Sequence, residues 1–78
     1  MNASIKYKMI AKFYDETLGM HLFTLENEMG GRVRKTAREI WLDKNYLNGL
    51  GYLDIYNIGF TRGVESVLEE GEAIRQAQ

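Results

Sequence analysis

The chain has 78 residues, a formal net charge of −1 and no cysteine, and 45% of its residues are hydrophobic. This length suits one small domain over residues 1–78, and the composition is that of a folded chain. The lack of cysteine excludes disulfides and thiolate metal sites. The near-zero charge gives no overall basic field for nucleic acid, and the apolar runs are too short to predict a membrane span.

Few residues could carry catalysis. The chain has one histidine, His21, and no cysteine that could act as a nucleophile. His21 lies between Met20 and Leu22, so we interpret it as a structural, half-buried side chain. We therefore expect no enzymatic activity, no cofactor and no metal site. We also expect a cytoplasmic location, because a chain without disulfides suits a reducing compartment.

A β-hairpin is the first predicted element. Apolar side chains alternate with mostly charged ones from residue 5 to residue 13, and this period of two is typical of a strand with one buried face. Residues 15–19 then read as a turn that ends on a glycine, and residues 20–25 as the returning strand. On this interpretation the outer face of the first strand carries Lys6, Lys8 and Lys12.

An all-α helical bundle is the alternative, because the same stretch also contains a helical apolar face. That face consists of Tyr7, Ile10, Ala11, Tyr14 and Leu18. A helix would, however, place Ile5 and Met9 among charged side chains, so we favour the hairpin.

A basic hinge is predicted after the paired glycines Gly30 and Gly31, which allow a sharp change of direction. Thr36 and Glu39 have the spacing of a capping box, which predicts a helix over residues 37–48. A helix N-terminus favours anions and disfavours cations. Four cations nevertheless surround this one: Arg32, Arg34, Lys35 and Arg38. We expect an anion opposite them, supplied by Glu26 or Glu28, by nucleic-acid phosphate or by an acidic protein surface.

A second, longer helix is predicted to run from a cap at Asp54 to about residue 76, after Gly49 and Gly51 have ended the first helix. We interpret its glycines as places where a neighbouring element packs too closely for a Cβ atom: Gly59, Gly63 and Gly71. One side carries apolar residues at three- and four-residue spacing: Leu53, Tyr56, Phe60, Val64, Val67, Leu68 and Ile74. Another carries an acidic row that we interpret as solvated: Glu65, Glu69 and Glu72.

These elements predict an α+β fold, an N-terminal β-hairpin followed by two antiparallel α-helices. Tyrosines gather near the junction of the helices, and tyrosine is enriched at protein interfaces. The candidate partner-binding residues are Tyr46, Tyr52 and Tyr56.

We therefore predict a non-enzymatic protein–protein interaction module, a small adaptor, regulator or inhibitor of the phage or mobile-element type. We expect it to bind another protein or a second copy of itself and not a membrane. The alternative is a nucleic-acid-binding regulator that holds phosphates with the four cations of the predicted hinge.

Overall fold

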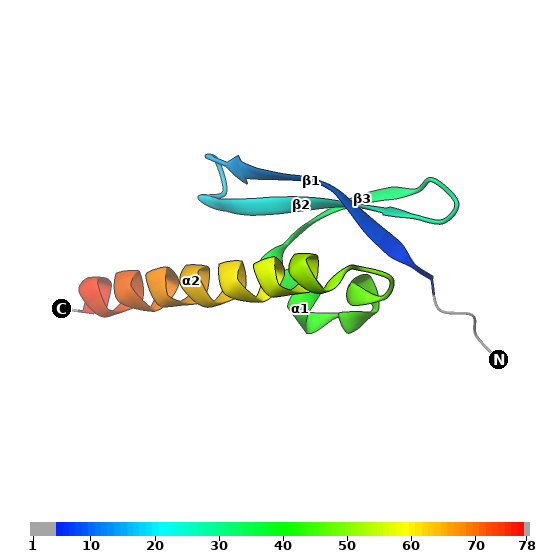
Figure 1. Ribbon diagram of the computed structural model, residues 1–78. Coiled ribbons are helices and arrows are strands. Elements are labelled where there is room, and N and C mark those ends of the chain that lie inside the picture. Colours follow the sequence, from blue (N-terminus) through cyan, green and yellow to red (C-terminus); the bar gives the residue numbers. More distant parts are fainter. Residues whose placement is uncertain (1–4, 78) are drawn as a thin grey trace.

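A three-stranded antiparallel sheet forms one layer of the molecule and the helices form the other (Figure 1). The computed structural model describes residues 5–77 and the side chains of residues 5–68. The strand order is β1-β2-β3. In chain order the elements are β1 Tyr7–Asp15, β2 Met20–Asn27, β3 Arg32–Thr36, α1 Ala37–Leu42, the 3₁₀ helix η1 Lys44–Leu47, and α2 Tyr52–Ala77.

The predicted hairpin is confirmed, and the all-α alternative is wrong. β1 and β2 pair antiparallel from Tyr7 opposite Asn27 to Asp15 opposite Met20. The turn between them closes on Gly19, which has a φ of 70° and donates its backbone N–H to the carbonyl of Asp15 at 2.8 Å. Glycine takes this left-handed conformation without the steric cost that a Cβ atom brings.

The predicted hinge is wrong, because its first five residues form the edge strand β3. β3 pairs antiparallel with β2, from Arg32 opposite Glu26 to Thr36 opposite Leu22. The change of direction predicted at the paired glycines is confirmed at Gly30, where φ is 85°. Val33 is the one apolar residue of β3, so the sequence shows no alternation there. β3 is therefore stabilised by its hydrogen bonds with β2 and not by an alternating apolar pattern of its own.

A β-bulge at Ile10 reverses the face on which each later residue of β1 lies. Met9 pairs with Leu25 and Lys12 pairs with Phe23, and both partners are fully buried. Two residues lie between Met9 and Lys12 on β1, whereas only one lies between their partners on β2. The extra residue on β1 places Lys12 on the helix side of the sheet. The expectation that Lys12 shares the outer face with Lys8 is therefore wrong.

The first helix begins as predicted but ends early. The Thr36 hydroxyl accepts from the backbone N–H of Glu39 at 3.2 Å, and the Glu39 carboxylate accepts from the backbone N–H of Thr36 at 3.0 Å. That second bond lowers the pKa of Glu39 below its ordinary value. α1 ends at Leu42, because Asp43 caps the 3₁₀ helix η1 through the backbone N–H of Asn45.

The long helix begins before its predicted cap. α2 starts at Tyr52, so Asp54 lies in its first turn. The two predicted helices are thus a helix of 6 residues and one of 26 residues. Their antiparallel arrangement stays a prediction.

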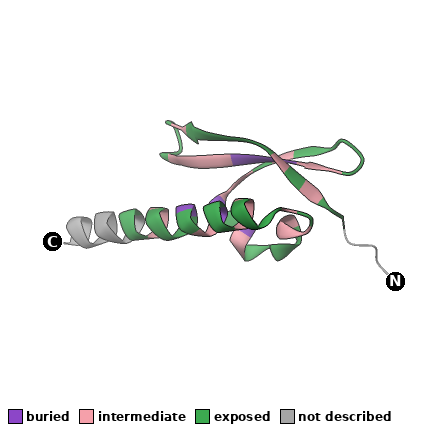
Figure 2. Cartoon of the chain, viewed as in Figure 1, coloured by how far each residue is buried: buried purple, intermediate pink, exposed green. Residues whose placement is uncertain are grey.

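The core is small and lies between β2, α1 and the first turns of α2. Five apolar residues are fully buried: Phe23, Leu25, Ala37, Ile40 and Ile58. Half-buried side chains from the sheet and the helices, among them Met9, Val33 and Trp41, pack against this cluster. Most of the described surface of α2 is exposed (Figure 2). The core therefore holds α2 near one end only.

Gly49 fixes the loop before α2 against the start of β1. Its φ is 90°, and a Cβ atom there would lie 2.9 Å from the backbone oxygen of Tyr7. The neighbouring Asn48 carbonyl accepts from the backbone N–H of Tyr7 at 2.8 Å. A side chain at position 49 would separate this loop from the strand.

We expect Gly49→Ala to lower the free energy of unfolding more than Gly30→Ala, as measured by urea denaturation. Both glycines have positive φ, so each alanine should cost about 1 kcal/mol of backbone strain. Only position 49 adds a clash with the chain, which should contribute about 1–3 kcal/mol more. Equal losses in the two variants would contradict the close approach of the loop to β1.

Candidate protein-binding surface

The side of α2 that points to solvent is apolar. Seven apolar side chains of α2 are between 44% and 84% exposed. Their spacing of three and four residues places them along one side of the helix. They are named here the α2 face: Tyr52, Leu53, Tyr56, Phe60, Val64, Val67 and Leu68. The rings of Tyr56 and Phe60 stack at 6.4 Å between centroids, so the face has an ordered aromatic centre.

The opposite side of α2 meets the sheet through polar groups. Beyond the buried Ile58, the Lys12 ammonium donates to the Thr61 hydroxyl at 3.4 Å. The backbone N–H of His21 donates to the Glu65 carboxylate at 2.8 Å, and the His21 ring nitrogen Nδ1 lies 3.2 Å from the same oxygen. The usual amphipathic arrangement is thus inverted here, with polar groups toward the sheet and apolar groups toward solvent.

These contacts decide two earlier expectations. His21 is half-buried, as predicted. Glu65 was expected on a solvated face, but its side chain is only 14% exposed, because it is held by His21. The side chains of Glu69 and Glu72 lie outside the described residues.

The two described glycines inside α2 differ in their surroundings. A Cβ atom at Gly59 would lie 3.3 Å from ring carbons of Trp41, so the close-packing interpretation is confirmed there. At Gly63 no described atom lies within 4 Å of such a Cβ. Gly71 lies outside the residues whose side chains are described. The fold of the described chain therefore gives no packing reason for Gly63.

A shallow hollow of about 420 Å³ opens beside Gly59 on the α2 face. It is lined by Trp41, Tyr52, Ile55, Tyr56, Gly59 and Phe60. Large apolar side chains thus surround Gly59, which has no side chain and forms the bottom of the hollow. Hollows of this kind accept an anchoring side chain of a partner protein.

The structure brings together two of the three candidate tyrosines. Tyr52 and Tyr56 lie on the α2 face and are 84% and 61% exposed. Tyr46 is half-buried, packs on the core and lies against the ring of Tyr7 at 5.4 Å between centroids. Phe60 belongs with the exposed pair although it was not a candidate. Its helical spacing was visible in the sequence, but that pattern does not distinguish an exposed apolar side from a buried one.

The four cations of the predicted hinge lie on different surfaces. Arg34 lies on the outer face of the sheet, with its guanidinium 5.6 Å from the centroid of the Phe13 ring. Lys35 lies on the helix side, 5.8 Å from the centroid of the Tyr46 ring. Arg38 is exposed in the first turn of α1. The structure therefore does not form one basic site from these residues.

The remaining cation, Arg32, is paired within the chain, as one of the expected alternatives proposed. Its Nε donates to the Glu26 carboxylate at 2.9 Å, and Lys8 Nζ lies 3.5 Å from the other oxygen. The Arg32 hydrogen bond lowers the pKa of Glu26 below its ordinary value. Glu26 thus neutralises part of the charge on the outer face of the sheet.

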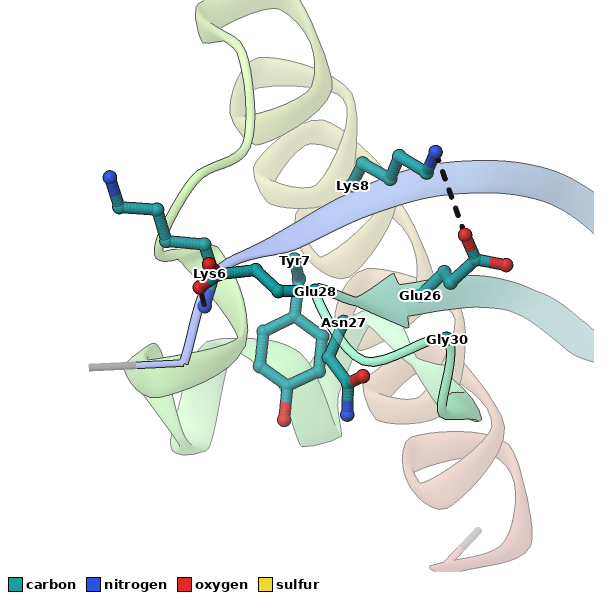
Figure 3. Close-up of a pocket in the computed structure, with 7 residues that line it drawn as sticks. All are labelled: Lys6, Tyr7, Lys8, Glu26, Asn27, Glu28 and Gly30. Atoms are coloured by element: carbon teal, nitrogen blue, oxygen red, sulfur yellow. Dashed lines mark hydrogen bonds and ion pairs between the residues drawn. The ribbon is translucent and has the colours of Figure 1, made fainter. Parts of the chain in front are cut away.

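A polar pocket of about 310 Å³ lies between the start of β1 and the turn that joins β2 to β3 (Figure 3). Its lining carries both signs of charge: Lys6, Tyr7, Lys8, Glu26, Asn27, Glu28 and Gly30. Glu28 accepts the backbone N–H of Lys6 at 3.1 Å, and the Lys6 ammonium points away from the other residues (Figure 3). Within the described part of the chain, no group of three or more His, Cys, Asp or Glu side chains could hold a metal ion. The pocket therefore offers less for binding than the α2 face.

Alanine substitutions at Ile58 and Phe60 should show, by their different effects on the free energy of unfolding, which side of α2 belongs to the core. We expect Ile58→Ala to lower the free energy of unfolding by about 2–5 kcal/mol, because its side chain is fully buried. Phe60→Ala should stay within about 0.5 kcal/mol of the parent when the chain is monomeric. Urea denaturation at low protein concentration measures both. A large loss for Phe60→Ala would place that ring in the core.

Comparison with known proteins gives this surface no precedent. No protein-family model matches the chain, and neither a curated protein nor a solved structure matches it significantly. Over the described residues, no helix has the length and hydropathy to cross a membrane. The geometry of the α2 face is therefore the basis for assigning a function.

Proposed function

We propose that the chain is a non-enzymatic protein–protein interaction module that binds a protein partner through the α2 face. The observation that carries the proposal is the exposure of seven apolar side chains along one side of α2. Contiguous exposed apolar patches are uncommon on monomeric proteins and mark interaction sites. The core of the domain uses the other side of the helix, so the α2 face is exposed among the residues that the structure describes.

The composition of the α2 face suits a protein partner. Tyr52, Tyr56 and Phe60 supply large side chains with few rotatable bonds, which lose little conformational entropy on binding. Such aromatic residues, set beside a hollow, resemble the anchors that dominate the energy of many interfaces. A helix that is already formed also binds without an ordering cost.

A module of this kind acts by occupying a surface of its partner or by joining two partners. We therefore propose an adaptor, regulator or inhibitor, in a cytoplasmic setting. The polar contacts of Thr61 and Glu65 with the sheet support this role, because they hold the helix with its apolar side outward.

Photo-crosslinking in the cell that makes the protein tests this proposal. A benzophenone side chain at Tyr56 should yield adducts of higher mass with protein, because this position lies at the centre of the α2 face. The matched control carries the same group at Arg62, which is exposed on the same helix but lies on a different side from the α2 face. Absence of adducts from Tyr56, Phe60 and Val67 alike would refute the proposal.

A second candidate function is nucleic-acid binding through the outer face of the sheet. No described helix covers this face, and it carries Lys8, Arg32 and Arg34 (Figure 1). Glu26 opposes two of these cations, which leaves a modest positive charge. This is weaker support than the α2 face has.

The outer face can be tested separately from the helix side. If it binds phosphates, the double variant Lys8→Ala and Arg34→Ala should weaken binding to a DNA duplex and flatten its salt dependence, with the slope of log K falling by about one per lost contact. Lys35→Ala is the control, since Lys35 lies on the opposite side of the sheet. Fluorescence anisotropy over 50–200 mM salt gives both quantities. Unchanged binding in the double variant would remove this candidate.

A further inference from the structure

We propose that the occupant of the α2 face is a second copy of this chain, so that two α2 helices pack on each other around a two-fold axis. This inference rests on the proposed function, since it names the partner of the same surface. A two-fold interface requires a surface that is complementary to itself in charge, shape and area.

The α2 face is compatible with itself in charge. Its seven side chains are apolar or tyrosine, so a second copy brings no like charge against the first. The net charge of −1 adds little repulsion between two whole chains. A partner of strong charge would find nothing on this face to pair with.

The α2 face is also complementary to itself in shape. Tyr52, Tyr56, Phe60, Val64 and Leu68 follow one another at steps of four residues and form a ridge of large side chains. The neighbouring row at the same step contains Gly59 and Gly63, and it forms a groove. Each copy thus carries both the ridge and the groove that the other needs, the arrangement that packs helices at about −50°.

This packing explains why a glycine is present at position 63 of α2. Glycine inside a helix costs about 0.5–1 kcal/mol relative to alanine, and at Gly63 nothing described within the chain occupies the space of a Cβ. Two helices approach most closely where both lack side chains at the crossing point. A second copy crossing at Gly63 supplies the close neighbour that the described part of the chain does not.

The area suffices for a stable dimer. An aromatic side chain offers roughly 150–250 Å², so three exposed aromatics with four aliphatic neighbours approach the ~800 Å² per partner of a standard interface. A dimer would also add stability that the small core does not supply, because only five apolar residues of the described chain are fully buried and no disulfide reinforces them. A second copy is present wherever the chain is made, so it can serve as a constant source of stability.

Sedimentation equilibrium of the full chain tests the dimer. We expect a concentration-dependent mass that rises from 9.0 kDa toward twice that value. Phe60→Glu should raise the dissociation constant at least ~30-fold, as expected for an interface hot spot. Thr17→Glu, which adds the same charge in the exposed β1–β2 turn, should change it little. Circular dichroism shows whether each variant is folded, and Val67→Glu takes the place of Phe60→Glu if that variant unfolds.

A substitution at the crossing point tests the packing independently. Gly63→Ala should raise the dissociation constant of the dimer about tenfold or more, because the added Cβ atom lies where the two helices approach most closely. The monomer should not lose stability, because no described atom lies within 4 Å of that Cβ atom and alanine favours a helix over glycine. Arg62→Ala is the control, since Arg62 is exposed on a different side of α2. An unchanged dissociation constant for Gly63→Ala would contradict a crossing at this residue.

The outcomes separate this inference from the proposed function. A chain that is monomeric at all concentrations, or a dimer that Phe60→Glu leaves intact, would overturn the dimer. Photo-crosslinks from Tyr56 to a different protein would then still support an interaction module. Loss of both the dimer and all crosslinks would overturn the two proposals together.

Discussion

The burial of Ile58 is the contact on which the arrangement of α2 depends. This side chain is fully enclosed with Phe23, Leu25 and Ile40, and it joins the first turns of the long helix to the sheet and to α1. Beyond it, α2 is held to the hairpin by hydrogen bonds to Thr61 and Glu65. A buried apolar contact followed by polar contacts leaves the opposite side of the helix exposed over the described residues.

The bulge at Ile10 makes one of those polar contacts possible. On a regular strand Lys12 would lie on the outer face with Lys8, and the helix side would lack the ammonium that binds Thr61. The extra residue turns Lys12 inward, where it also lies 5.5 Å from the centroid of the buried Phe23 ring. One inserted residue thus converts an outer cation into a tie between the two layers.

The distribution of charge also favours protein binding over nucleic-acid binding. The cations of β3 and α1 are divided among the outer face, the helix side and the start of α1, and Glu26 and Glu39 oppose part of the charge there. The charge is therefore spread and partly compensated, while the apolar side chains of α2 lie together. Of the two candidate functions, protein binding uses the more concentrated of these features.

The sequence by itself determined the hairpin, the Thr36/Glu39 capping box and the presence of a long C-terminal helix, because period-two alternation, caps and helical spacing are local properties. Tertiary structure decided three other points. β3 exists through pairing with β2, the bulge at Ile10 exists through register, and the apolar side of α2 is exposed because Ile58, Thr61 and Glu65 occupy the side toward the sheet. Helical spacing shows that an apolar side exists, but only the packing of the other elements determines whether that side is buried in the core or left for a partner.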